Sequence, residues 1–136
     1  MTAPTETADV AALRVKANAG DAHTQSNLGV MYAEGLGVPQ DYAQAVAWYR
    51  KAAEQGLADA QHNLGVAYAN GRGVPQDYVE SHKWTNLAAS RASAENQKRY
   101  AEARDAVAKL MTPAQLADAQ QRASAWLAAF EKRGGK

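Results

Sequence analysis

The stretch that decides the fold is GVPQDY at residues 37–42, because the same six residues return without a change at residues 73–78. The agreement extends upstream with the same spacing of 36 residues, since NLG at residues 27–29 recurs at residues 63–65. Self-similarity at a fixed period of this length is typical of repeat proteins, in which each unit packs mainly against its neighbours. The sequence therefore predicts two full copies of one 36-residue unit.

Each unit is predicted to fold as two helices joined by a turn. Over residues 21–34, small and apolar side chains return every three or four positions, which is the spacing of one helix face. The second helix is expected over residues 42–55 and, in the second unit, over residues 78–90. Trp48 stands there among alanines, and a large side chain beside small ones favours close pairing with another helix.

Residues that end and begin helices mark the turn of each unit. Gly35 suits the positive φ found at helix C-termini. Asp41 is a good N-cap for the second helix, and Gln44 three residues later completes the pattern of a capping box. The second unit has Asp77 and Glu80 at the same positions. The pattern therefore predicts two helix starts at equivalent positions.

A glycine lies inside the first helix of each unit, at Gly29 and Gly65. Glycine in a helix interior costs about 1 kcal/mol relative to alanine. Its presence at both equivalent positions indicates that a second helix passes too close to accommodate a side chain.

The ends of the chain depart from the repeat. A long helix is expected over residues 93–110, and Thr112 with Pro113 and Gln115 predicts the start of a last helix. We expect that helix to cover the end of the stack, since terminal repeats need modified faces. The single domain of residues 1–136 is thus divided into an N-terminal half-repeat helix (5–19), repeat 1 (20–55), repeat 2 (56–91), a degenerate third-repeat helix (92–111) and a C-terminal capping helix (112–133).

The repeated unit resembles the bacterial Sel-one-like repeat, a relative of the tetratricopeptide repeat. The resemblance rests on the NLG and GVPQDY stretches and on WYRKAA at residues 48–53, and LMTPAQL at residues 110–116 is similar to the C-terminal extension of bacterial members. The resemblance implies an all-α fold, a right-handed α-solenoid of antiparallel helix pairs with two full repeats plus flanking helices. It also implies an adaptor whose concave face, lined by the first helices, recruits a protein or peptide.

Composition narrows the function classes. The net charge of +1 lacks the strongly basic character expected of a nucleic-acid binder, although residues 1–70 carry −3 and residues 71–136 carry +4. The chain has no cysteine, so disulfides and thiolate metal sites are excluded. No apolar stretch is long enough for membrane insertion, and the polar start does not resemble a signal peptide. We expect a cytoplasmic protein, with periplasmic or secreted location left open for a chain whose signal segment has been removed.

The candidate binding face lies on the first helices. Positions 24, 27, 31 and 34 share one face by the three-and-four spacing, and only the asparagine is kept in the second unit. An asparagine amide can hold the backbone of an extended peptide while its neighbours select side chains. The alternative is that Asn27 and Asn63 brace the neighbouring turn through backbone hydrogen bonds. The candidate residues are Thr24, Asn27, Met31, Glu34, Ala60, His62, Asn63, Ala67, Asn70 and Arg99.

The sequence offers no recognisable catalytic pattern. None of His23, His62 and His82 has another histidine at the three- or four-residue spacing of a zinc site, and the Ser-x-x-Lys and Gly-x-Ser-x-Gly patterns do not occur. The sequence therefore favours a non-enzymatic scaffold without a cofactor or metal. Two other readings stay open: a β-lactam-binding or hydrolysing repeat protein, and a self-associating structural module. A monomer is expected, with the oligomeric state left open.

Overall fold

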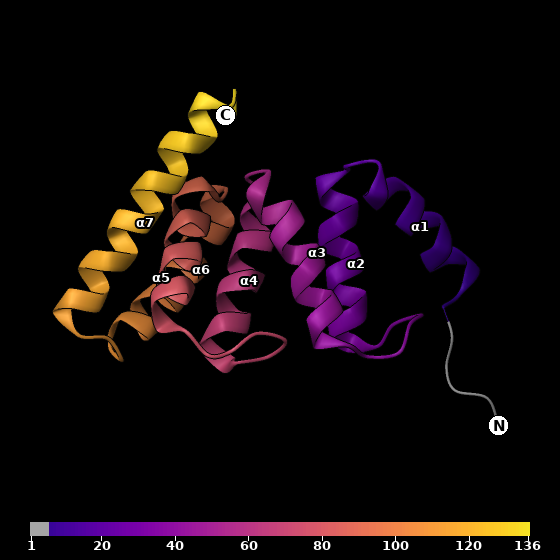
Figure 1. Cartoon of the computed structure of the whole chain (residues 1–136), viewed down its shortest axis with the longest axis horizontal. Coiled ribbons are helices and arrows are strands. Elements are labelled where there is room, and N and C mark those ends of the chain that lie inside the picture. The colour runs from indigo at the N-terminus through magenta and orange to yellow at the C-terminus, as the bar shows by residue number, and fades with distance from the viewer. Residues whose placement is uncertain (1–5) are drawn as a thin grey trace.

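The computed structural model describes residues 6–136, and within that range every regular element is an α-helix (Figure 1). The polar start at residues 1–5, including the first residue of the expected half-repeat, lies outside the described residues. The helices agree with the expected ones to within two residues at each end, except that α1 begins three residues after the expected start of the half-repeat. They are α1 (Ala8–Asn18), α2 (Ala22–Glu34), α3 (Tyr42–Glu54), α4 (Ala58–Asn70), α5 (Tyr78–Arg91), α6 (Ala94–Ala108) and α7 (Pro113–Lys132).

Figure 1 shows the helices arranged along the longest axis of the molecule, from α1 at one end to α5, α6 and α7 at the other. We call α2, α4 and α6 the first helices and α1, α3 and α5 the second helices. Within each unit the first helix pairs with the second, α2 with α3 and α4 with α5, and each first helix also packs on the second helix before it. The core follows this pairing, with Leu28, Leu64 and Trp84 fully buried between the layers. The predicted all-α helical repeat is confirmed.

The two interior glycines lie where the paired helices come closest. A Cβ built on Gly29 would be 2.6 Å from the ring of Tyr49 in α3. On Gly65 it would be 2.6 Å from Thr85 Cγ2 and 3.0 Å from the carbonyl oxygen of Ser81, both in α5. The prediction that another helix excludes a side chain here is confirmed, and backbone as well as side chain limits the space at Gly65.

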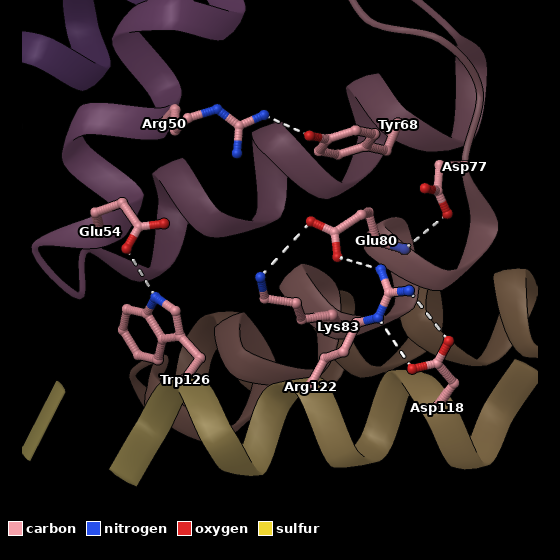
Figure 2. Close-up of polar contacts among 9 residues, drawn as sticks. All are labelled: Arg50, Glu54, Tyr68, Asp77, Glu80, Lys83, Asp118, Arg122 and Trp126. Atoms are coloured by element: carbon pink, nitrogen blue, oxygen red, sulfur yellow. Dashed lines mark hydrogen bonds and ion pairs between the residues drawn. The ribbon is translucent and has the colours of Figure 1, made fainter. Parts of the chain in front are cut away.

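The turns form as predicted, with one correction at the second helices. Gly35 is left-handed at φ 69°, and Asp41 accepts a hydrogen bond from the amide of Gln44 at 3.1 Å. Asp77 caps Glu80 in the same way, but neither Gln44 nor Glu80 returns the reciprocal bond. Instead, Glu80 pairs with Lys83 and Arg122, as Figure 2 shows. The full capping box forms only at Thr112 among the described helices, where the Gln115 side chain accepts a hydrogen bond from the Thr112 amide at 2.9 Å.

A polar link also returns with the period and joins each second helix to the first helix that follows it. Arg14 donates to the hydroxyl of Tyr32, and Arg50 donates to the hydroxyl of Tyr68 (Figure 2). At the third junction the partners are exchanged, because Arg104 of α6 donates to Asn86 of α5 at 3.2 Å. The position of the link is therefore kept while its chemistry changes.

The last helix lies on the layer of second helices. Helix α7 packs against α5 rather than pairing with α6 in the manner of the two full repeats. Trp126 packs edge-on against Trp84 with ring centroids 5.7 Å apart, and its indole nitrogen donates to Glu54 at 3.0 Å (Figure 2). Helix α7 therefore covers α5 and also reaches the end of α3, which precedes α7 by four helices in the chain.

Candidate functional site

A groove of about 130 Å³ lies where α2, α3 and α4 meet. Buried side chains of α3 form its base, and partly exposed side chains of α4 form its rim. Because typical sites for drug-sized ligands measure roughly 300–1,000 Å³, this groove is large enough for about one side chain. Its lining residues are Ala33, Tyr42, Ala45, Val46, Tyr49, Asn63, Val66, Ala67, Asn70 and Arg72.

Three of the residues predicted from the sequence line this groove together: Asn63, Ala67 and Asn70. They come from one face of α4, as the three-and-four spacing requires. Val66, which is 36% exposed, lies on the same helix and adds an apolar contact that the sequence comparison did not single out.

The other candidates divide into accessible and buried residues. Asn27 and Glu34 are exposed on α2 but do not line the groove, and Met31 is half-buried. Thr24 and Ala60 are 6% and 0% exposed, so in this structure neither can be reached by a partner. These two equivalent positions lie near the start of their helices, where packing between units encloses them, and spacing along one helix carries no information about such packing.

The remaining candidates lie at the next junction. The ring of His62 stacks on Tyr100 of α6 with centroids 4.4 Å apart, and burial together with the Arg99 charge lowers the pKa of His62. Arg99 is exposed on α6 and lies over the Tyr100 ring at 5.0 Å. His62 is thus largely held in packing, whereas Arg99 remains on the surface.

The asparagine side chains have available hydrogen-bonding groups. Within residues 6–136, neither Asn27 nor Asn63 forms a side-chain hydrogen bond with protein. The turns that follow α2 and α4 are held by Gln40, which donates to the Ala33 carbonyl at 2.8 Å, and by the equivalent Gln76. At these turns, the bracing hydrogen bonds that we considered for Asn27 and Asn63 are formed by glutamine side chains.

The floor of the groove is uncharged, and its rim carries a positive charge. Burial, with smaller contributions from the Glu34 and Asp59 carboxylates, raises the pKa of Tyr49 to about 12, so its phenol is uncharged at neutral pH. Arg72 lies over the Tyr42 ring at 5.4 Å and has no ion-pair partner within residues 6–136. The lining contains no carboxylate, histidine or serine. A nucleophile with an adjacent base is therefore not assembled in this groove.

Sequence reasoning missed the residues of α3 that form the base and the residue at the rim, Arg72. A signal for them was present in the second helices. Val46 and Tyr49 become His82 and Thr85 in the second unit, so the lining changes between units just as the face of the first helix does. Comparing both helices of the unit would have pointed to this position.

The described residues offer neither a cluster of metal-binding side chains nor a helix that could span a membrane. Across residues 6–136, no three histidine, aspartate or glutamate side chains gather in a way that could hold a metal ion. None of the helices in that range has both the length and the apolar character needed to cross a bilayer.

The comparisons with known proteins agree on one repeat. The Sel1 repeat model matches residues 22–57 and 58–93, more than half of the chain. A protective antigen present in uropathogenic Escherichia coli strains, displaying an SLR fold, aligns at 34% identity with a TM-score of 0.80, covering 90% of this chain and 27% of that one. A Sel1 repeat protein from Oxalobacter formigenes aligns at 39% identity with a TM-score of 0.56, covering 60% and 34%. The chain thus spans about a quarter to a third of these two proteins. No significant match is found among curated proteins.

Proposed function

The chain belongs to the Sel1 repeat family, and on that premise we propose that it is a non-catalytic scaffold that binds a short extended segment of another protein. The proposal is carried by one observation: the predicted face of α4 opens onto an apolar groove of about 130 Å³ between the repeats. Repeat proteins of this kind use the extended surfaces created by stacking to hold partners. A groove without a nucleophile or base supports binding rather than catalysis.

The groove suits an apolar side chain flanked by backbone. Val66, Ala67 and the α3 residues beneath them supply the apolar lining. Asn63 and Asn70 lie on the same face, and each amide can donate to and accept from a peptide backbone. Because so small a groove contacts few residues, we expect modest affinity, with micromolar rather than nanomolar dissociation constants.

The decisive variant is Ala67→Met, which uses a residue that the chain itself has at the equivalent position, Met31. The longer side chain fills the groove without changing charge. Ala47→Met is the matched control, because Ala47 is exposed on α3 and does not line the groove. Peptides selected from a displayed random library against the native chain would be measured on all three proteins by fluorescence polarisation.

We expect the selected peptides to share an apolar residue and to bind at least about tenfold more weakly to Ala67→Met, with Ala47→Met unchanged. Asn63→Ala together with Asn70→Ala should weaken binding further by removing the amides. Equal binding to the native chain and Ala67→Met would contradict the groove as the site. Circular dichroism melts must show that each variant keeps its helices, so that loss of binding is not loss of fold.

A further inference from the structure

A second groove, of about 270 Å³, lies where α5, α6 and α7 meet. It opens there because α7 packs on α5 and leaves the flank of α6 uncovered. Its lining is mainly polar and shares no residue with the groove between the repeats. The polar residues are His82, Asn86, Arg104, Asp105 and Gln120.

Three of these residues occupy positions at which the chain breaks its own repeat. The earlier junctions have a buried valine, an arginine and a tyrosine, as at Val46, Arg50 and Tyr68. The third junction has His82, Asn86 and Arg104 instead. Residues that depart from a locally consistent pattern are expected at functional sites. Three linked departures around one open groove indicate a site rather than drift of a single position.

The geometry leaves hydrogen-bond donors available toward the groove. Arg104 uses Nη1 for Asn86 at 3.2 Å and Nε for Asp105 at 3.0 Å, which leaves Nη2 without a partner within residues 6–136. Asn86 accepts through Oδ1, so its amide nitrogen is also unused. His82 is 3% exposed, and its Nδ1 is buried without a hydrogen-bond partner.

We propose that this groove binds a carboxylate group, held by the Arg104 guanidinium and the Asn86 amide. A guanidinium beside an amide donor matches the two oxygens of a carboxylate. A carboxylate group carries one negative charge, so it suits a site whose positive charge is reduced by the neighbouring Asp105 carboxylate better than a phosphate group does. The volume is large enough for a small dicarboxylate molecule or for an acidic side chain of a partner protein.

The Asp105 carboxylate competes with an incoming carboxylate for the Arg104 guanidinium. Its side chain is 64% exposed and pairs with the adjacent Arg104 at the surface, where ion pairs contribute little. An incoming carboxylate can replace it on the guanidinium. Removing the Asp105 charge should therefore tighten binding, whereas a merely structural Arg104–Asp105 pair predicts no such gain.

The test measures two probes on the full chain by NMR, succinate and the acetylated, amidated tripeptide Ala-Glu-Ala. The side-chain signals of Asn86 and Arg104 would report saturable binding directly. Arg104→Gln removes the guanidinium and keeps an amide at that position. Lys98→Gln is the matched control, because it removes one positive charge from an exposed position of the same helix outside the groove.

We expect saturable shifts with millimolar or tighter dissociation constants, a loss of at least about tenfold in Arg104→Gln and none in Lys98→Gln. Asp105→Asn should tighten binding about threefold. A stronger response to succinate supports a small dicarboxylate as the ligand, and a stronger response to the tripeptide supports an acidic protein segment. Absence of saturation with either probe, or equal losses in Arg104→Gln and Lys98→Gln, would overturn the proposal.

Discussion

The junction of α3 with α4 and the junction of α5 with α6 occupy equivalent places in the repeat and differ in what lines them. Where α3 meets α4, Val46 and Tyr49 form the uncharged floor of an apolar groove. Where α5 meets α6, His82 and Asn86 give a polar groove beside Arg104. The backbone requirements of the repeat, a close glycine and a capped turn, are met in both full units. The residues between those fixed points are free to change, and that freedom creates two surfaces of different chemistry.

The largest effect is expected from truncating the tryptophan that α7 covers. Trp84 is fully buried and packs against Trp126, whereas its counterpart Trp48 is 6% exposed and has no such aromatic partner in α7. Trp84→Ala should lower the free energy of unfolding by about 4 kcal/mol, and Trp48→Ala should lower it less. Urea unfolding followed by circular dichroism measures both, and equal losses would show that covering by α7 adds nothing at this position.

Substitution of the interior glycine should likewise cost more stability in the second unit than in the first. The Cβ of alanine at Gly65 would lie 3.0 Å from the Ser81 carbonyl oxygen and 2.6 Å from the Thr85 side chain. At Gly29 it would lie 2.6 Å from the Tyr49 ring and 3.2 Å from the Ala45 carbonyl oxygen, so the backbone is closer at Gly65. Since backbone yields less readily than a side chain, Gly65→Ala should cost about 2 kcal/mol and Gly29→Ala about 1 kcal/mol, after the helix propensity of alanine is counted. Thermal melts of the two variants suffice to rank them. A reversed order would place the tighter helix pair in the first unit.

The exchanged polar link can be restored to the form used by the other junctions. Asn86→Arg and Arg104→Tyr together recreate the pair of Arg50 and Tyr68. The double variant should lose less stability than the sum of the losses of the two single variants. We expect a coupling free energy of about 0.5–1 kcal/mol in the double-mutant cycle. Additive single effects would mean that residues 86 and 104 do not act together.

The smallest effect concerns pH. Burial, and then the Arg104 charge, lowers the pKa of His82, although Asp105 opposes this shift. The unfolded chain therefore binds more protons than the folded chain near and below the ordinary histidine pKa of about 6.5. Stability is complete above that pH and is lost as the pH falls toward the lowered folded pKa. His82→Val, which introduces the residue found at position 46, should reduce the loss seen between pH 7.5 and 5.5 in chemical unfolding.

Much of the fold could be predicted because the repeat appears twice in the sequence. Asp41 and Gly35 mark helix ends through interactions with backbone groups a few residues away. Residue type and position in the sequence were therefore enough to predict those boundaries. The links that needed three dimensions were not predicted. Arg50 and Tyr68 are 18 residues apart on different helices, and the burial of Thr24 depends on neighbouring units. Asn63, Ala67 and Asn70 of the groove lining were among the predicted residues, whereas the α3 residues were missed because only the first helices of the two units were compared.

The placement of α7 bears on how the chain completes its fold during synthesis. Within the described residues that precede α7, side-chain hydrogen bonds join residues at most 35 positions apart, as between Gln55 and Gly20 inside the first unit and, at 33 positions, between Ser26 and Asp59 of successive units. Trp126 and Arg133 instead reach Glu54 across 72 and 79 positions. Units of a solenoid can form as each one emerges, because their contacts are local. Here the layer of second helices is closed only after α7 has been synthesised, so residues made after both full units join those units into one cooperative body.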